Sequence, residues 1–215
     1  MTLLELFPDD RSEQQIDPGA RILPGFALGE TAGLLAAIDA IQAQAPLRHL
    51  VTPGGQSMSV AMTNCGRAGW YSDRKGYRYT KTDPLTGMPW PAMPSLFLRL
   101  AQRAAGHCGY DGFDPDACLV NFYAPGARMS PHQDRDEGNL TAPIVSVSLG
   151  LSATFLWGGL KRNDRQRRFR LAHGDVVVWG GPTRLAYHGV APLADGDHPV
   201  TGRKRFNLTF RQAYA

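Results

Sequence analysis

Three residues, two of them near neighbours and one much later in the chain, have the side chains that a non-haem iron site requires. His132 and Asp134 are separated by one residue, and His188 follows much later in the sequence. Two imidazoles and one carboxylate can bind Fe(II) and leave three coordination positions open. Residues two apart in a strand share a face, so His132 and Asp134 can aim at one point. The alternative for this short motif is a polar turn after Pro131, and the decision therefore depends on the third ligand.

His188 is the best candidate for that third ligand, because it lies at the end of a buried-looking apolar segment, 185–190. The alternative for His188 is a hydrogen-bonded histidine of the core. We expect His173 in a hairpin turn and His198 in a solvated loop, where neither would face a metal. The remaining candidates, His49 and His107, lie in the helical N-terminal half.

The segment from Arg205 to Arg211 alternates polar and apolar side chains with the period of a strand. One face carries Arg205, Asn207, Thr209 and Arg211, and the other carries Phe206, Leu208 and Phe210. Two arginines that point inward need an anion, and a dicarboxylate cosubstrate would supply it through charge-assisted hydrogen bonds. Asn121 and Tyr123 repeat the pattern on another expected strand and could add donors. The alternative is a solvent-facing edge strand with alternating charge.

The strands that would position these residues are concentrated in the second half of the chain. Short β-prone runs separated by turn residues predict strands at 117–123, 144–149, 154–157, 168–171, 175–179, 186–190 and 205–211. Many short strands with Gly and Pro turns indicate a sandwich or jelly roll.

Two helices are expected before these strands. Apolar residues at helical spacing predict the first over 31–45, ended by Pro46. The second should begin at Pro94, run to about Ala105, and end at Gly106 and Gly109. Residues 1–28 are expected to be irregular, with one short strand at 20–23. Residues 50–92 are expected to form hairpins and loops that act as a lid.

Length and composition fit one globular domain with a small lid. The chain has 215 residues, of which 43% are hydrophobic, and a formal net charge of +4. Basic residues gather at 161–168 and at 74–81, where either set could touch phosphates or form a solvated polar loop. The three cysteines form no C-x-x-C pair, which is typical of a reducing compartment. Met1 to Asp10 shows no signal peptide and no stretch could span a bilayer, so we expect a cytoplasmic, soluble monomer.

Several segments resemble, in order and spacing, bacterial members of the AlkB family of Fe(II)- and 2-oxoglutarate-dependent alkylated-nucleic-acid demethylases. The resemblance is good from about residue 62 to residue 213 and weak over the first 50 residues. The segments that carry it are Asn121–Ala127, His132–Asp134, Ala142–Gly150, Gly158–Arg162, His173–Trp179 and Arg205–Arg211.

The resemblance implies a mainly β (α+β) fold with a double-stranded β-helix (jelly-roll) core. It divides the chain into an N-terminal extension with a helix at 1–48, a nucleotide-recognition lid at 49–92, and a dioxygenase core with a supporting helix at 93–215. Iron would be held by His132, Asp134 and His188. Arg205, with Asn207 and Tyr123, would hold the far carboxylate of 2-oxoglutarate, and Arg211 with Asn121 would lie by the metal-chelating end. Phe122, between Asn121 and Tyr123, is included in the expected cosubstrate site.

The resemblance also implies a set of substrate contacts. These are Trp70, Tyr77, Arg78, Tyr79, Asp136 and Arg162. Tyr71-Ser72-Asp73 and Arg78 depart from the usual pattern of the lid. Trp70 and the His132 ring could stack on an extruded base, and Asp136 could favour a cationic one.

The expected activity is oxidative demethylation of 1-methyladenine and 3-methylcytosine in DNA, with single-stranded DNA preferred. The enzyme would use Fe(II), O2 and 2-oxoglutarate and release formaldehyde, succinate and CO2. Its partners would be single- or double-stranded DNA or RNA, with no membrane and no obligate protein partner. Two alternatives remain open: a 2-oxoglutarate oxygenase that acts on RNA, a protein or a small molecule, and a jelly-roll module that binds nucleic acid without catalysis.

Overall fold

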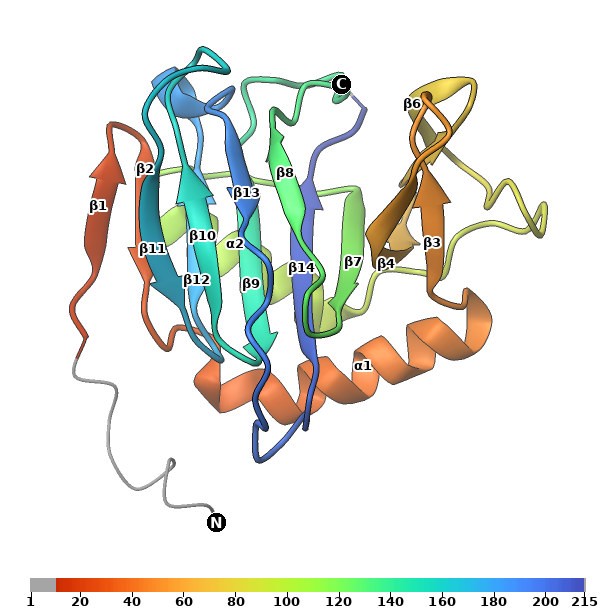
Figure 1. Cartoon of the computed structure of the whole chain (residues 1–215), viewed down its shortest axis with the longest axis horizontal. Coiled ribbons are helices and arrows are strands. Elements are labelled where there is room, and N and C mark those ends of the chain that lie inside the picture. The colour runs from red at the N-terminus through yellow and green to blue at the C-terminus, as the bar shows by residue number, and fades with distance from the viewer. Residues whose placement is uncertain (1–10, 215) are drawn as a thin grey trace.

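Two antiparallel sheets lie face to face and form the β-sandwich that the sequence predicted (Figure 1). The structure is a computed structural model that describes residues 11–214. In spatial order, the major sheet contains β1 (Gln14–Asp17), β2 (Ala20–Leu23), β12 (Val176–Trp179), β9 (Ile144–Gly150), β14 (Arg205–Arg211), β7 (Ala117–Tyr123), β4 (Ser57–Gly66) and β3 (Arg48–Val51). The minor sheet contains β11 (Arg167–Leu171), β10 (Ala153–Trp157), β13 (His188–Val190) and β8 (Met129–His132).

Both helices pack on the outer face of the major sheet, because each has an apolar stripe that the sheet can bury. The helices are α1 (Thr31–Gln44) and α2 (Ser95–His107). The core between them and the sheet joins Leu34 and Phe97 to Val147 and Leu208. This layer leaves the other face of the major sheet free to meet the minor sheet. Neither these helices nor the short 3-10 turns of the described residues, η2 (Leu28–Glu30) and η3 (Gly181–Thr183), could cross a membrane.

The second helix differs from its prediction at both ends. Pro94 is the residue before the helix rather than its first turn, and the helix continues through Gly106 to His107. The left-handed conformation that closes it belongs to Gly109, whose φ is 85°. The first helix matches its prediction to within one residue.

The predicted lid is only partly separate from the core. A hairpin of β5 (Gly69–Asp73) and β6 (Gly76–Thr80) forms its own small sheet. The strands β3 and β4, which precede it, extend the major sheet, because residues 61–66 of β4 pair with β7 and β3 pairs with β4. The boundary expected near residue 49 therefore does not separate two structural layers. The first ten residues of the predicted extension lie outside the described part of the chain.

Candidate metal centre and adjoining cavity

The two ligand histidines lie opposite each other on paired strands of the minor sheet. His132 ends β8 and His188 begins β13, and the two are direct partners in the antiparallel register. Their rings are 4.5 Å apart between centroids. Gly189 permits this approach, since a Cβ there would lie 2.6 Å from the carbonyl oxygen of Met129. The pairing of β8 with β13 thus brings together residues that are distant in sequence.

Asp134 completes the cluster from the loop that follows β8. The ligand atoms of His132, Asp134 and His188 all lie within 4.8 Å of one another. Asp134 Oδ1 is 3.5 Å from His132 Nε2, and Oδ2 is 3.7 Å from His188 Nε2. The prediction that these three side chains converge is confirmed. The expectation that Asp134 shares a strand with His132 is wrong, because β8 ends at His132.

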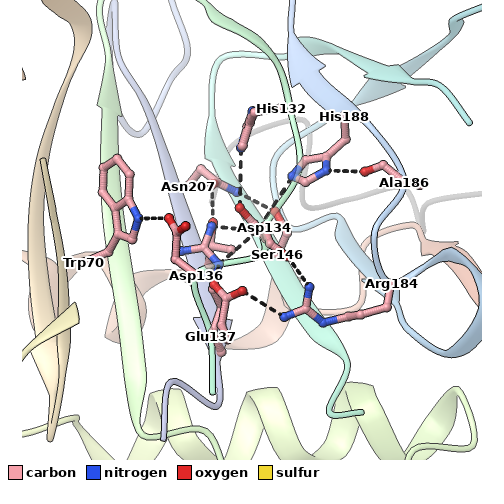
Figure 2. Close-up of polar contacts among 12 residues, drawn as sticks. Trp70, His132, Asp134, Asp136, Glu137, Ser146, Arg184, Ala186, His188 and Asn207 are labelled. Carbon is pink, nitrogen blue, oxygen red and sulfur yellow. Dashed lines mark hydrogen bonds and ion pairs between the residues drawn. The ribbon is translucent and has the colours of Figure 1, made fainter. Parts of the chain in front are cut away.

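Backbone carbonyls fix the tautomer of both imidazoles. His132 Nδ1 lies 2.9 Å from the carbonyl oxygen of Ser130, and His188 Nδ1 lies 3.0 Å from that of Ala186 (Figure 2). A carbonyl can only accept, so each Nδ1 carries the proton and each Nε2 presents a lone pair to the centre. Burial, with His132 nearby, lowers the pKa of His188 to about 4, which keeps this ring neutral near pH 7. For His132, burial opposes protonation, but the Asp134 carboxylate raises the pKa of the ring above its usual value. Both Nε2 atoms face the centre, where they can bind a cation.

The Asp134 carboxylate is held by a buried arginine from the major sheet. Arg211 Nε and Nη2 lie 2.9 and 2.8 Å from Asp134 Oδ2. Burial works against the charged form, but Arg211 and the two histidines hold the pKa of Asp134 well below its usual value. The charge of Arg211 is thus balanced by a carboxylate of the protein itself. The strand pattern had suggested that a cosubstrate would supply the balancing anion.

A second buried arginine fixes the loop that carries Asp134. Arg184 donates to the carbonyl oxygens of Asp134 and Ala142 at 2.6 and 2.9 Å, and to Glu137 Oε2 at 3.2 Å (Figure 2). Glu137 Oε1 accepts from the Tyr79 hydroxyl at 2.7 Å, which connects this loop to β6. The contacts make Arg184 and Glu137 supports of the metal ligand, a role that sequence reasoning missed.

Arg205 differs from Arg211, because part of its guanidinium has no hydrogen-bond partner in the described part of the chain. Its side chain is 1% exposed, and Nη2 donates to Ser148 Oγ at 3.0 Å. Nε and Nη1 have no hydrogen-bond partner among residues 11–214. The guanidinium lies over the Tyr123 ring, 4.8 Å from its centroid. An unpaired buried donor costs about 1–3 kcal/mol, so this group is fitted to receive a carboxylate from a small molecule.

The polar face of β14 lines a cavity between the sheets, as its alternation predicted. Arg205, Asn207, Thr209 and Arg211 border the cavity, while Phe206, Leu208 and Phe210 lie in the helix-side core. Asn121 Nδ2 donates to Asn207 Oδ1 at 3.2 Å, so the two amides act as one group. The Phe122 side chain does not reach the cavity, since alternation turns it to the other face against Phe206. The expected contact of Phe122 with the cosubstrate therefore cannot come from its side chain in this cavity.

The serines of β9 belong to the same polar face, although they were not selected from the sequence. Ser146 Oγ accepts from Asn207 Nδ2 at 2.8 Å, and Ser148 is the partner of Arg205 described above. The available signal was the alternation of both serines with valines in the expected strand 144–149. The aromatic wall beside His188 carried no such signal, because Phe155, Trp157 and Trp179 read only as core residues.

The cavity has a volume of about 530 Å³, and Trp70 and Tyr77 of the hairpin of β5 and β6 are among the residues that line it. This volume is within the range of ligand sites, about 300–1,000 Å³. Trp70, Tyr77, Asp136 and Arg162 border it together with the metal triad. Trp70 stacks on Tyr77 at 5.6 Å, and its Nε1 donates to Asp136 Oδ2 at 3.0 Å (Figure 2). Arg162 lies over the ring of Tyr187, the neighbour of His188, at 5.5 Å.

Two expected substrate contacts do not border the cavity. Arg78 forms a two-pronged ion pair with Asp73 within the hairpin, at 2.7 and 2.9 Å. Tyr79 packs against Ala68, Ala117 and Ala213, where burial raises the pKa of its hydroxyl and where it donates to Glu137. In the structure, both residues stabilise the hairpin or its base.

The other histidines lie away from the triad. His173 is in the turn before β12, as expected, and accepts a hydrogen bond from the Gly150 N–H. His198 was expected to be solvated, but it is half-buried because its ring packs 4.6 Å from that of His173. His107 lies by Glu13, and His49 is exposed on β3.

Comparison with known proteins agrees with this geometry. Residues 19–211 match the 2OG-Fe(II) oxygenase superfamily. The alpha-ketoglutarate-dependent dioxygenase AlkB of Escherichia coli K12 is 57% identical over 212 residues, 98% of each chain. The AlkB homolog of Caulobacter vibrioides NA1000 is 46% identical over 198 residues, 91% of this chain and 88% of its own.

Similarity extends to solved structures. The structure of OsALKBH1 superposes with a TM-score of 0.80 at 26% sequence identity, and the match covers 94% of this chain and all of the other. The fold, the metal ligands and the sequence similarity therefore all indicate the same family of oxygenases.

Proposed function

Since the chain belongs to the 2OG-Fe(II) oxygenase superfamily and is an AlkB-type dioxygenase, we propose that it removes methyl groups oxidatively from N-alkylated bases of DNA. The proposed lesions are 1-methyladenine and 3-methylcytosine, and the proposed products are formaldehyde, succinate and CO2. The family requires Fe(II), 2-oxoglutarate and O2. One observation carries the proposal. The metal triad borders the same cavity as Trp70 and Arg205, whose Nε and Nη1 have no hydrogen-bond partner among residues 11–214.

Each polar group of the cavity has a distinct role in this proposal. Iron would be held by His132, Asp134 and His188. When bound, it would enable O2 to oxidise both 2-oxoglutarate and the methyl group. Arg205, with the Tyr123 ring beneath it, binds the far carboxylate of 2-oxoglutarate. Arg211 orients the Asp134 carboxylate, and the Asn121–Asn207 pair lines the path between these two ends.

The base would enter from the side of the hairpin. A methyl group on the pairing edge of a base is hidden in a duplex, so the base must be extruded or already unpaired, which favours single-stranded DNA. Trp70 and the His132 ring both border the cavity and offer stacking surfaces, which contribute about 1–3 kcal/mol per base. Tyr77 and Arg162, at the rim, would contact the flanking nucleotides. All three cysteines are free thiols, which supports the proposal that the protein acts in a reducing cytoplasm.

The direct test is to incubate the protein with Fe(II), 2-oxoglutarate and a single-stranded oligonucleotide that contains one 1-methyladenine. We expect formaldehyde and the mass loss of one methylene unit per oligonucleotide, and we expect neither when iron is chelated. Succinate release without any change in the oligonucleotide would leave a 2-oxoglutarate oxygenase with a different substrate. An oligoribonucleotide of the same sequence measures the preference for DNA.

Asp136 should set the preference for cationic lesions. Its carboxylate borders the cavity beside Trp70, where it would favour 3-methylcytosine, which is positively charged, over 3-methylthymine, which is neutral. Asp136→Asn keeps an oxygen acceptor for Trp70 Nε1 and removes only the charge. We expect this variant to lower the ratio of kcat/KM values for the two lesions by about 5-fold, because the carboxylate is exposed and its attraction is screened. An unchanged ratio would mean that Asp136 only orients Trp70 through their hydrogen bond and does not select the lesion.

A further inference from the structure

The segment 161–170 holds most of the unbalanced charge of this protein. It contains six basic side chains and one acidic side chain, whereas the whole chain has a net charge of only +4. The acidic residue, Asp164, is used within the loop, where Oδ2 accepts from the Lys161 N–H at 2.9 Å. The remainder of the chain has a net charge of −1, so this segment is a strong local source of attraction for a polyanion.

Three arginines of this segment present free charge on one edge of the molecule. The strand β11 is the edge strand of the minor sheet (Figure 1). Its Phe169 and Leu171 turn towards the core, so Arg168 and Arg170 turn outward, and both are exposed. Arg165 and Arg168 make no ion pair or side-chain hydrogen bond with the described residues 11–214, and Arg170 reaches only the hydroxyl of Ser152. By contrast, Arg167 is paired with Asp17.

The same segment lies beside the rim of the cavity, where hydrogen bonds connect it to residues that border the cavity. Gln133, between two metal ligands in sequence, donates from Nε2 to the carbonyl oxygens of Leu185 and Leu160 at 2.7 and 3.5 Å. Gly158 and Gly159 exchange backbone hydrogen bonds with Tyr187. Arg162 borders the cavity. Arg162 at the cavity rim and the outward-facing arginines of β11 therefore belong to one segment that is held at this rim.

We infer that Arg165, Arg168 and Arg170 bind the phosphodiester backbone of the lesion-bearing strand where it leaves the cavity. This inference rests on the proposed function, because it requires a nucleic-acid substrate. Arg168 and Arg170 are two residues apart, which separates them by about 6.7 Å along the strand, close to the spacing of neighbouring phosphates in an extended single strand. Guanidinium groups bind phosphate through paired hydrogen bonds without reading the base. This surface therefore increases affinity for longer strands and leaves lesion choice to the cavity.

The test compares the triple variant Arg165→Ala/Arg168→Ala/Arg170→Ala with a control, Arg99→Ala/Arg103→Ala/Arg203→Ala. The control removes the same charge from α2 and from the loop before β14, where all three side chains are exposed. The substrates are a trinucleotide with a central lesion and strands of about 15 nucleotides that extend it on the 5′ side only or on the 3′ side only. For each, kcat and KM are measured between about 50 and 200 mM salt.

We expect extension on one side only to lower the KM of the wild-type protein, and we expect the triple variant to lose this gain. Its KM for that strand should rise about 10-fold, and the slope of log KM against log salt should fall by about 2, from about 0.7 for each of three phosphates. Its kcat and its KM for the trinucleotide should equal those of the wild type. The control variant should retain the gain from extension.

Two results would overturn the inference: equal KM values for the triple variant and the wild type on every strand, and an equal loss in the control variant. Polyglutamate that competes as well as an unmodified strand would assign the surface to an acidic protein instead. Failure of the proposed function would look different, because the wild type would then demethylate nothing. In that case, fluorescence anisotropy with an unmodified strand of about 15 nucleotides still compares the two variants.

Discussion

His188→Ala is expected to abolish demethylation and the binding of stoichiometric iron while leaving the chain folded. His188 supplies one of three protein ligands, and its Nε2 faces Asp134 because Nδ1 is engaged by the Ala186 carbonyl. Substitutions that only support a ligand cost about 10–100-fold in metal affinity or activity, so the loss of a ligand should exceed about 100-fold. The measurements are iron content after dialysis, succinate release, and circular dichroism.

The loss of stability in this variant should be modest. The imidazole makes one hydrogen bond and packs against Trp179, so its removal should lower the free energy of unfolding by about 1–3 kcal/mol. His173→Ala is the control, because it removes a half-buried imidazole that likewise has one backbone partner, Gly150. The control should bind iron and turn over normally. Full iron occupancy in His188→Ala would refute the assignment of this residue to the metal.

Asp134→Ala would be a less informative variant, for a reason that only the structure shows. Arg211 is buried and pairs with Asp134 at 2.8 Å, with Glu137 farther away at 3.4 Å. The loss of one member of a buried ion pair costs about 3–5 kcal/mol, because the other charge remains desolvated. Inactivity could then result from unfolding, whereas removal of the neutral His188 ring avoids this ambiguity.

The parts of the site that the sequence predicted are those with a strong local pattern. The strand 205–211 was predicted with its bounds and both faces, since polar and apolar residues alternate along its whole length. The same period located β7, with Asn121 and Tyr123 directed to the cavity and Phe122 directed away from it. The resemblance placed Phe122 in the cosubstrate site, whereas the alternation directs its side chain towards Phe206 on the opposite face.

The parts that could not be predicted depend on contacts between distant segments. The strand β8 has four residues, includes Pro131, and exists because it pairs with β13. Likewise, the strand β4 looked like part of the lid because its sequence does not reveal that β7 is its partner. Arg184 and Glu137 are charged residues in loops, and their burial at the metal centre follows from the packing of three separate segments. Nothing in the local sequence distinguishes them from solvated charges.

The contrast between the two buried arginines leads to an unusual prediction for Arg205. Nε and Nη1 of Arg205 have no partner among residues 11–214, and burial lowers the pKa of its guanidinium. Arg205→Met has a similar volume and leaves no buried charge without a partner. We expect the free enzyme to be as stable as the wild type or more stable, because an apolar side chain in place of a buried charge stabilises by up to about 4 kcal/mol. Arg211→Met should be destabilising instead, since it leaves the buried Asp134 carboxylate without its cationic partner.

Cosubstrate binding should change in the opposite direction to stability. Two charge-assisted hydrogen bonds from Arg205 to a carboxylate contribute about 1.5–3 kcal/mol each, so Arg205→Met should raise the KM for 2-oxoglutarate by about 100-fold or more. Arg205→Lys, which keeps the charge but not the paired geometry, should have an intermediate effect. Thermal unfolding with and without 2-oxoglutarate gives a readout that does not depend on turnover. The wild type should be stabilised by the cosubstrate and Arg205→Met should not. An unchanged KM together with a large loss of stability would make Arg205 a structural residue and would require a different anchor for the cosubstrate.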